Sequence, residues 1–73
     1  MALEAIVRRA GVDRVVLEQY PEGVYVFVFE RPDSHHPYRD YLQDSWDRAR
    51  GFCEDEYGIP ESEWTEIPDP RLR

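Results

Sequence analysis

The chain has 73 residues, which is room for one domain over residues 1–73, and its single cysteine, Cys53, excludes an internal disulfide. The formal net charge of −7 disfavours direct binding of nucleic acid, because affinity for phosphates rests on clustered basic side chains. Residues 1–11 lack an apolar run long enough for a signal peptide or a membrane helix, so together with the lone thiol they predict a cytoplasmic protein with no membrane partner.

The N-terminal segment up to residue 10 repeats apolar side chains at the spacing of a helix. The residues that recur at this spacing are Leu3, Ile6, Val7 and Ala10. Gly11 follows them as a C-cap, so the pattern predicts a short amphipathic helix at about residues 2–10. The adjacent pair Ile6 and Val7 leaves an alternative open, in which the same residues belong to an extended edge strand.

Two arms rich in β-branched and aromatic residues predict a β-hairpin over about residues 14–30. The arms flank Pro21-Glu22-Gly23, and the run from Tyr20 to Gly23 fits a type I turn with proline at its second position. If Gly23 takes the left-handed position of a G1 bulge, Tyr20 pairs with Val24, and this pair sets the register of the whole hairpin.

This register divides the hairpin into two faces. The predicted core face holds Val15, Leu17, Tyr25, Phe27 and Phe29. The other face holds Val16, Glu18, Tyr20, Val24, Val26 and Val28. The second arm is apolar on both faces, which is typical of a central strand that is covered on both sides. We therefore expect the N-terminal segment or another copy of the protein to cover Val24, Val26 and Val28.

Apolar residues at helical spacing return downstream of the hairpin. The stripe consists of Trp46, Ala49, Cys53 and Tyr57, with Asp44 or Ser45 as N-cap and Gly58 and Pro60 as stop signals. We expect a main helix at about residues 44–57 and a short third strand at about 38–43, since a hairpin needs a third strand for independent stability. A single helix over residues 38–57 is the alternative. Gly51 inside the helix costs about 1 kcal/mol relative to alanine, which we interpret as close approach of the helix to the sheet.

The C-terminal part, residues 60–73, is expected to be a loosely ordered acidic tail, with one helical turn at about residues 60–64 that lays Trp64 over the core. Residues 54–69 hold seven acidic side chains and no base, which fits a solvated face or a surface for a basic partner. The predicted fold is α+β, a small antiparallel β-meander packed by one main helix on the face of Leu17, Phe27 and Phe29.

The loop after the hairpin holds the residue types best suited to chemistry. Asp33, His35 and His36 are candidate metal ligands, with Asp40 or Cys53 as a further ligand. Adjacent histidines on irregular backbone usually point apart, whereas a metal needs three or four converging ligands. Cys53 lies on the apolar stripe of the helix, so we expect a buried core residue rather than a reactive thiolate. A metal-binding protein or a small metal-dependent hydrolase is the alternative function that this loop leaves open.

Residues 15–58 resemble a recurring class of small uncharacterised bacterial proteins of hairpin-strand-helix type. The motifs that carry the resemblance are Tyr20-Pro21-Glu22-Gly23, Tyr25-Val26-Phe27, Asp44-Ser45-Trp46-Asp47-Arg48-Ala49 and Glu56-Tyr57-Gly58-Ile59. The order of elements is similar to the partner-binding domain of HicB-type antitoxins. The chain departs from that pattern because it lacks an appended DNA-binding segment and a glycine-bearing third strand, so the resemblance implies a fold and carries over no active-site residue.

We expect a non-enzymatic protein–protein interaction module without a cofactor, because the aromatic content exceeds what so small a core can hide. Its partner would be a second copy of the chain, giving a homodimer, or a basic protein. The expected interaction residues are Val24, Val26, Val28, Glu54, Asp55, Glu61, Glu63 and Trp64.

Overall fold

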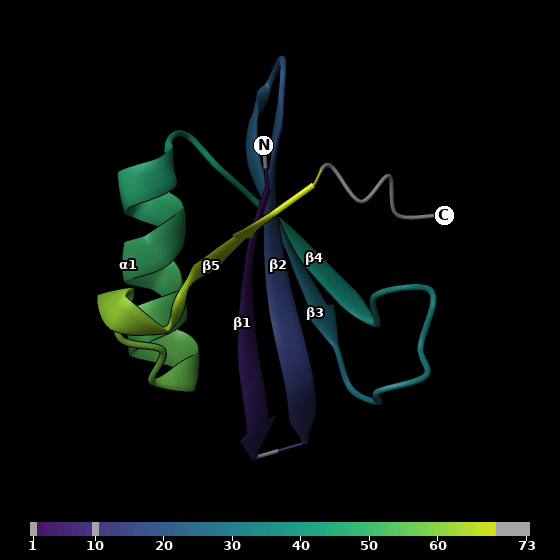
Figure 1. The fold of residues 1–73 in the computed structure, drawn as a ribbon. Coiled ribbons are helices and arrows are strands. Elements are labelled where there is room, and N and C mark those ends of the chain that lie inside the picture. Colours follow the sequence, from purple (N-terminus) through teal and green to yellow (C-terminus); the bar gives the residue numbers. More distant parts are fainter. Residues whose placement is uncertain (1, 10, 69–73) are drawn as a thin grey trace.

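The computed structural model describes residues 2–9 and 11–68 of the chain (Figure 1). Its elements, in chain order, are β1 (Ala2–Arg9), β2 (Val12–Tyr20), β3 (Gly23–Phe29), β4 (Arg39–Gln43), α1 (Trp46–Tyr57), the 3₁₀ turn η1 (Glu61–Glu63) and β5 (Thr65–Ile67). The five strands form one antiparallel sheet in the order β4-β3-β2-β1-β5. The predicted α+β class and antiparallel meander are confirmed, with more strands than expected.

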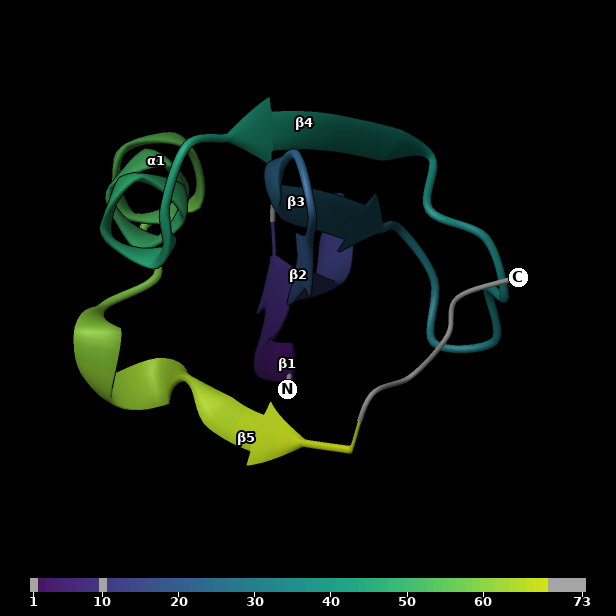
Figure 2. The same cartoon turned by 90° about the horizontal axis from the view of Figure 1, so that it is seen from above.

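Helix α1 lies on one face of this sheet, as the view from above shows (Figure 2). We call this the helix face, and the face that turns away from α1 the second face. No helix in the described part of the chain is long and apolar enough to cross a membrane.

The N-terminal segment is a strand, so the predicted short helix at residues 2–10 is wrong. β1 pairs antiparallel with β2, with Leu3 opposite Leu17, and its other edge pairs with β5. The extended alternative is therefore right, although β1 lies inside the sheet rather than at its edge. Pairing on both edges satisfies backbone N–H and C=O groups that a lone short helix would leave to water, and this outweighs the helical spacing of the apolar residues.

The hairpin and its strands are confirmed, but the predicted register is wrong by one residue. Tyr20 pairs with Gly23, not with Val24, across the two-residue turn Pro21-Glu22. Gly23 has φ of 151°, and a Cβ at this position would collide with the backbone carbonyl oxygen of Gln43 in β4. Glycine is required here because β4 passes so close to the start of β3.

A shift of one residue exchanges the two faces of β3, because side chains alternate along a strand. Val24, Val26 and Val28 therefore join Val15 and Leu17 on the helix face. The predicted placement of the helix over Phe27 and Phe29 is wrong, since both rings belong to the second face. The helix presents small residues to the sheet, Ala49 and Cys53, so α1 packs closely on the valine row.

The expected third strand and main helix are confirmed as β4 and α1, and the alternative of one helix over residues 38–57 is wrong. Ser45 is extended and its Oγ accepts a hydrogen bond from the Arg48 N–H at 3.2 Å, so it caps the helix as predicted. Gly58 ends the helix in the left-handed conformation, with φ of 65°. The interpretation of Gly51 as a close approach is wrong, because nothing lies within 4 Å of a Cβ built there.

The segment after α1 returns along the sheet instead of leaving it. The predicted helical turn is present as η1, and Trp64 packs against the core on the helix face. Ile59 is buried in the same core. The chain then adds β5 to β1, and residues 69–73 of the expected tail lie outside the described residues.

Candidate interaction surfaces

The second face carries aromatic rings at the end nearest the hairpin turn. We call Tyr20, Tyr25, Phe27 and Leu42 the aromatic surface. The Tyr25 and Phe27 rings are stacked with their centroids 5.6 Å apart, and the Tyr20 ring meets Tyr25 edge-on at 5.0 Å. All three rings are only partly buried, and Leu42 is 47% exposed. The register between β3 and β4 completes this cluster, because it places Tyr25 directly opposite Leu42.

Carboxylates border the aromatic surface. The Tyr25 hydroxyl donates a hydrogen bond to Glu22 Oε2 at 3.3 Å. Asp40 lies directly opposite Phe27 in the register of β3 and β4 and is exposed. The pKa of Tyr25 is raised by desolvation, by the charge of Glu22 and its hydrogen bond, and by the charge of Asp40. Its hydroxyl therefore lies in a negative potential.

The other end of the second face is closed by Arg14. Its guanidinium lies over the Phe29 ring, 4.0 Å from the centroid. The same group donates to the backbone carbonyls of the loop that follows β3, with 3.3 Å to Arg31 O and 3.1 Å to Ser34 O. Arg14 thus holds the loop against the sheet, and Phe29 is fully buried.

The candidate metal ligands lie in this loop and do not form a site. Asp33, His35 and His36 are all exposed. Among residues 2–9 and 11–68, no group of three or more His, Cys, Asp or Glu side chains is close enough to hold a metal ion. Of the two further ligands that the sequence suggested, Asp40 is exposed in β4, and Cys53 lies on the side of α1 that faces the sheet and is fully buried.

The thiol of Cys53 behaves as a core group. Burial raises its pKa to about 12, from an ordinary value near 9.0. The thiol is therefore protonated at neutral pH, and the expectation of a core residue is confirmed.

The valines expected to form an interaction surface are not accessible. Val24, Val26 and Val28 are fully buried under α1. The expectation that the N-terminal segment or a second copy covers them followed from the wrong hairpin register, which also assigned the aromatic rings to the core. The aromatic surface was missed for this reason, because the observed two-residue turn, unlike a three-residue loop, places the rings on the second face.

The acidic residues after Cys53 are exposed along α1, η1 and β5. We call Glu54, Asp55, Glu56, Glu61, Glu63 and Glu66 the acidic segment. None of them forms an ion pair with another described residue. The sequence-based expectation placed Glu54, Asp55, Glu61, Glu63 and Trp64 in one interaction surface, but Trp64 is partly buried against the core and contributes little outer surface.

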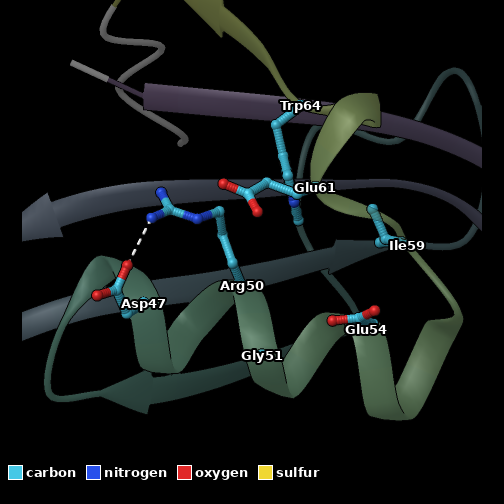
Figure 3. A pocket seen from close by; sticks show the side chains of 7 residues that line it. All are labelled: Asp47, Arg50, Gly51, Glu54, Ile59, Glu61 and Trp64. Carbon is cyan, nitrogen blue, oxygen red and sulfur yellow. Dashed lines mark hydrogen bonds and ion pairs between the residues drawn. The ribbon is translucent and has the colours of Figure 1, made fainter.

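A small pocket lies between α1 and η1 (Figure 3). Its volume is about 170 Å³, and Arg50, which lines it, donates to Asp47 Oδ1 at 2.7 Å. Trp64 also lines the pocket, and its buried Nε1–H has no hydrogen-bond partner among the described residues. A space of this size holds a few water molecules, which are the usual partners of such a buried donor.

A third group with a shifted pKa, Tyr41, lies in the edge strand β4. Arg39 donates to the Tyr41 hydroxyl at 3.0 Å, and this hydrogen bond lowers the pKa of Tyr41. Tyr41 packs on the Phe52 ring of α1 at 4.7 Å between centroids, so the pair fastens β4 to the helix.

No protein-family model, no curated protein and no solved structure matches this chain significantly. The similarity to HicB-type antitoxin domains therefore stays a prediction based on the order of elements.

Proposed function

We propose that the protein is a non-enzymatic interaction module that binds another protein through its aromatic surface. The observation that carries the proposal is the partial exposure of three aromatic rings and Leu42 on the second face. Large aromatic side chains bury much area at low conformational cost, and they are enriched in protein interfaces. A contiguous apolar patch that stays in contact with water marks an interaction site in a soluble domain.

The titratable groups with shifted pKa values support contact rather than chemistry. The Cys53 thiol is neutral and lies under the helix, where a substrate has no access. Tyr41 is held by a hydrogen bond from Arg39 and packs on the Phe52 ring, so it has a structural role between β4 and α1. His35 and His36 have no third ligand near them in the described part of the chain, so they do not support the metal-dependent alternative.

We place the module in the cytoplasm, where a lone thiol stays reduced. The partner there is a different protein or a second copy of the chain. The acidic segment is a second candidate surface for a basic protein, since its six carboxylates have no ion-pair partner among the described residues.

The proposal is tested by site-specific photo-crosslinking in the cell of origin. A photoreactive phenylalanine analogue replaces Leu42 in the aromatic surface or, in the control, Asp55 in the acidic segment. We expect one reproducible protein adduct from position 42, which mass spectrometry identifies and which purified components then reproduce. Adducts from position 55 alone would assign binding to the acidic segment, and the absence of an adduct from both positions would contradict a protein-binding role.

The oligomeric state is measured separately by sedimentation of the purified protein at high micromolar concentration. A dimer that dissociates on Tyr25→Gln would identify the partner as a second copy.

A further inference from the structure

The aromatic surface combines two features that together select a cation. Its rings present negatively polarised faces, and carboxylates stand at its border. Glu22 accepts from the Tyr25 hydroxyl, and Asp40 lies beside Phe27 in the adjacent strand. A guanidinium that stacks on such a ring reaches a neighbouring carboxylate at the same time, and each contact strengthens the other when water is excluded.

The chain supplies its own example of this recognition. Arg14 lies 4.0 Å above the Phe29 ring on the same face of the sheet, while it also forms an ion pair with Glu4 at 3.7 Å. Tyr25 and Phe27 are the next aromatic residues along β3, and no arginine of the described residues lies over either ring. Tyr25 and Phe27 therefore have two of the three groups found at Phe29, which are a ring and a neighbouring carboxylate. The third group, a guanidinium, would come from a binding partner.

The edge of the sheet beside the aromatic surface shows how such a ligand would be presented. β4 is the terminal strand, and Tyr38, just before it, and Leu42, near its end, are 46% and 47% exposed. An extended segment that adds to an edge strand places every second side chain on one face of the sheet. Arginines at alternate positions would then lie beside Asp40 and Leu42, within reach of the stacked rings.

We propose that Tyr25, Phe27 and Leu42, with the carboxylates of Glu22 and Asp40, bind arginine side chains of an extended basic segment of a protein partner. The inference rests on the proposed function and names the chemistry of its partner. Arginine is preferred to lysine because its planar guanidinium stacks on a ring while its N–H groups bond a carboxylate.

The test uses the full chain and a short fluorescent peptide with arginine at alternate positions and threonine between them. Binding is followed by fluorescence anisotropy at about 0.15 M salt, where the Debye length is about 8 Å. We expect the lysine version of the peptide to bind at least about threefold more weakly. The citrulline version, which keeps the planar shape without the charge, should show no measurable binding.

Variants of the surface locate the binding. Asp40→Asn and Tyr25→Leu should each weaken binding of the arginine peptide by about threefold to tenfold, as expected for the loss of one charged hydrogen bond or one cation–ring contact. The matched control is Glu61→Gln with Glu63→Gln, which removes acidic charge from the acidic segment and should change binding less than about twofold. An unchanged circular dichroism spectrum and unfolding midpoint confirm that each variant is folded.

Three results would overturn the inference. Equal weakening by the control pair would show that overall charge attracts the peptide. Unchanged binding in Tyr25→Leu would show that the rings do not take part. A peptide that does not bind, together with a protein adduct at position 42, would show that the surface binds a partner of other chemistry. The proposed function would then survive. A dimer that is lost in Tyr25→Leu would identify that partner as a second copy.

Discussion

The two faces of the sheet are packed differently, although β3 contributes neighbouring residues to both. On the helix face, β3 contributes Val24, Val26 and Val28, which are fully buried against the small residues of α1. On the second face it contributes Tyr25 and Phe27, whose rings stack on one another and stay partly exposed. The small residues Ala49 and Cys53 let α1 lie close to the valine row, whereas no described helix covers the rings of the second face.

The largest difference between the faces is expected from the same substitution at adjacent residues. Val26→Gln places an unpaired amide beneath α1 and should destabilise the domain by about 3 kcal/mol or more, which is most of the stability of a domain of this size. Tyr25→Gln loses ring contacts at a wetted surface and should cost about 1 kcal/mol. Urea denaturation followed by circular dichroism measures both. Equal losses would show that the two faces are covered to the same degree.

The sequence predicted the elements better than their faces. The strand at residues 39–43, the cap at Ser45, one of two candidates, and the buried Cys53 were each predicted correctly. The cap and the buried thiol follow from local signals, and the strand follows from a hairpin's need for a third strand. The assignment of valines and rings to the two faces depends on whether Tyr20 pairs with Gly23 or Val24, and both pairings suit a Tyr-Pro-Glu-Gly turn. The close passage of Gln43 over Gly23 helps to decide between them, and that contact joins residues distant in the sequence.

The N-terminal strand could not be predicted for a related reason. The spacing of Leu3, Ile6 and Val7 suits a helix or a strand, and the choice is made by the two partners that β1 finds in β2 and β5. β5 itself is only three residues long and carries no strong strand signal. The aromatic surface was missed because rings are normally assigned to the core, and the burial of Phe29 alone follows that rule.

The buried thiol of the helix face should make stability depend on pH above about 9. Burial raises the pKa of the Cys53 thiol to about 12 in the folded protein, from an ordinary value near 9.0. The thiol's contribution is complete below the unfolded pKa and is lost as pH rises toward the folded value, so stability should fall by about 2 kcal/mol between about pH 9 and pH 11. Tyr57 adds to this loss, because burial also raises its pKa.

The control for this pH dependence is Cys53→Ala, which removes the thiol from the same position. Unfolding midpoints in urea at about pH 7, 9 and 11 should decline less steeply in the variant than in the wild type. Parallel declines would show that the thiol is hydrated in the folded state, and that α1 does not seal the helix face.

A smaller effect is expected where β1 holds the end of the helix. Arg9 donates to the carbonyl oxygens of Tyr57 at 3.1 Å and Gly58 at 2.8 Å, which lie at the C-terminal end of α1. Arg9→Ala should therefore cost about 1 kcal/mol in thermal or urea unfolding. The neighbouring Arg8→Ala is the control and should cost less than about 0.5 kcal/mol. Arg8 is 70% exposed, and its ion-pair partner Asp13 also forms an ion pair with Arg14, which the substitution leaves in place. A larger loss in Arg8→Ala than in Arg9→Ala would contradict this anchor.

The smallest effect, and the only gain, is expected from Gly51 on the outer side of α1. A Cβ at this position meets no atom within 4 Å, and the residue has no left-handed backbone to preserve. Gly51→Ala should raise the free energy of unfolding by about 0.5 to 1 kcal/mol, because alanine restricts the unfolded chain and favours the helix. Gly58→Ala is the matched control and should destabilise, since Gly58 has φ of 65°. A loss of stability in Gly51→Ala would mean that this side of the helix is packed, and that α1 is enclosed on both sides rather than covering the valine row from outside.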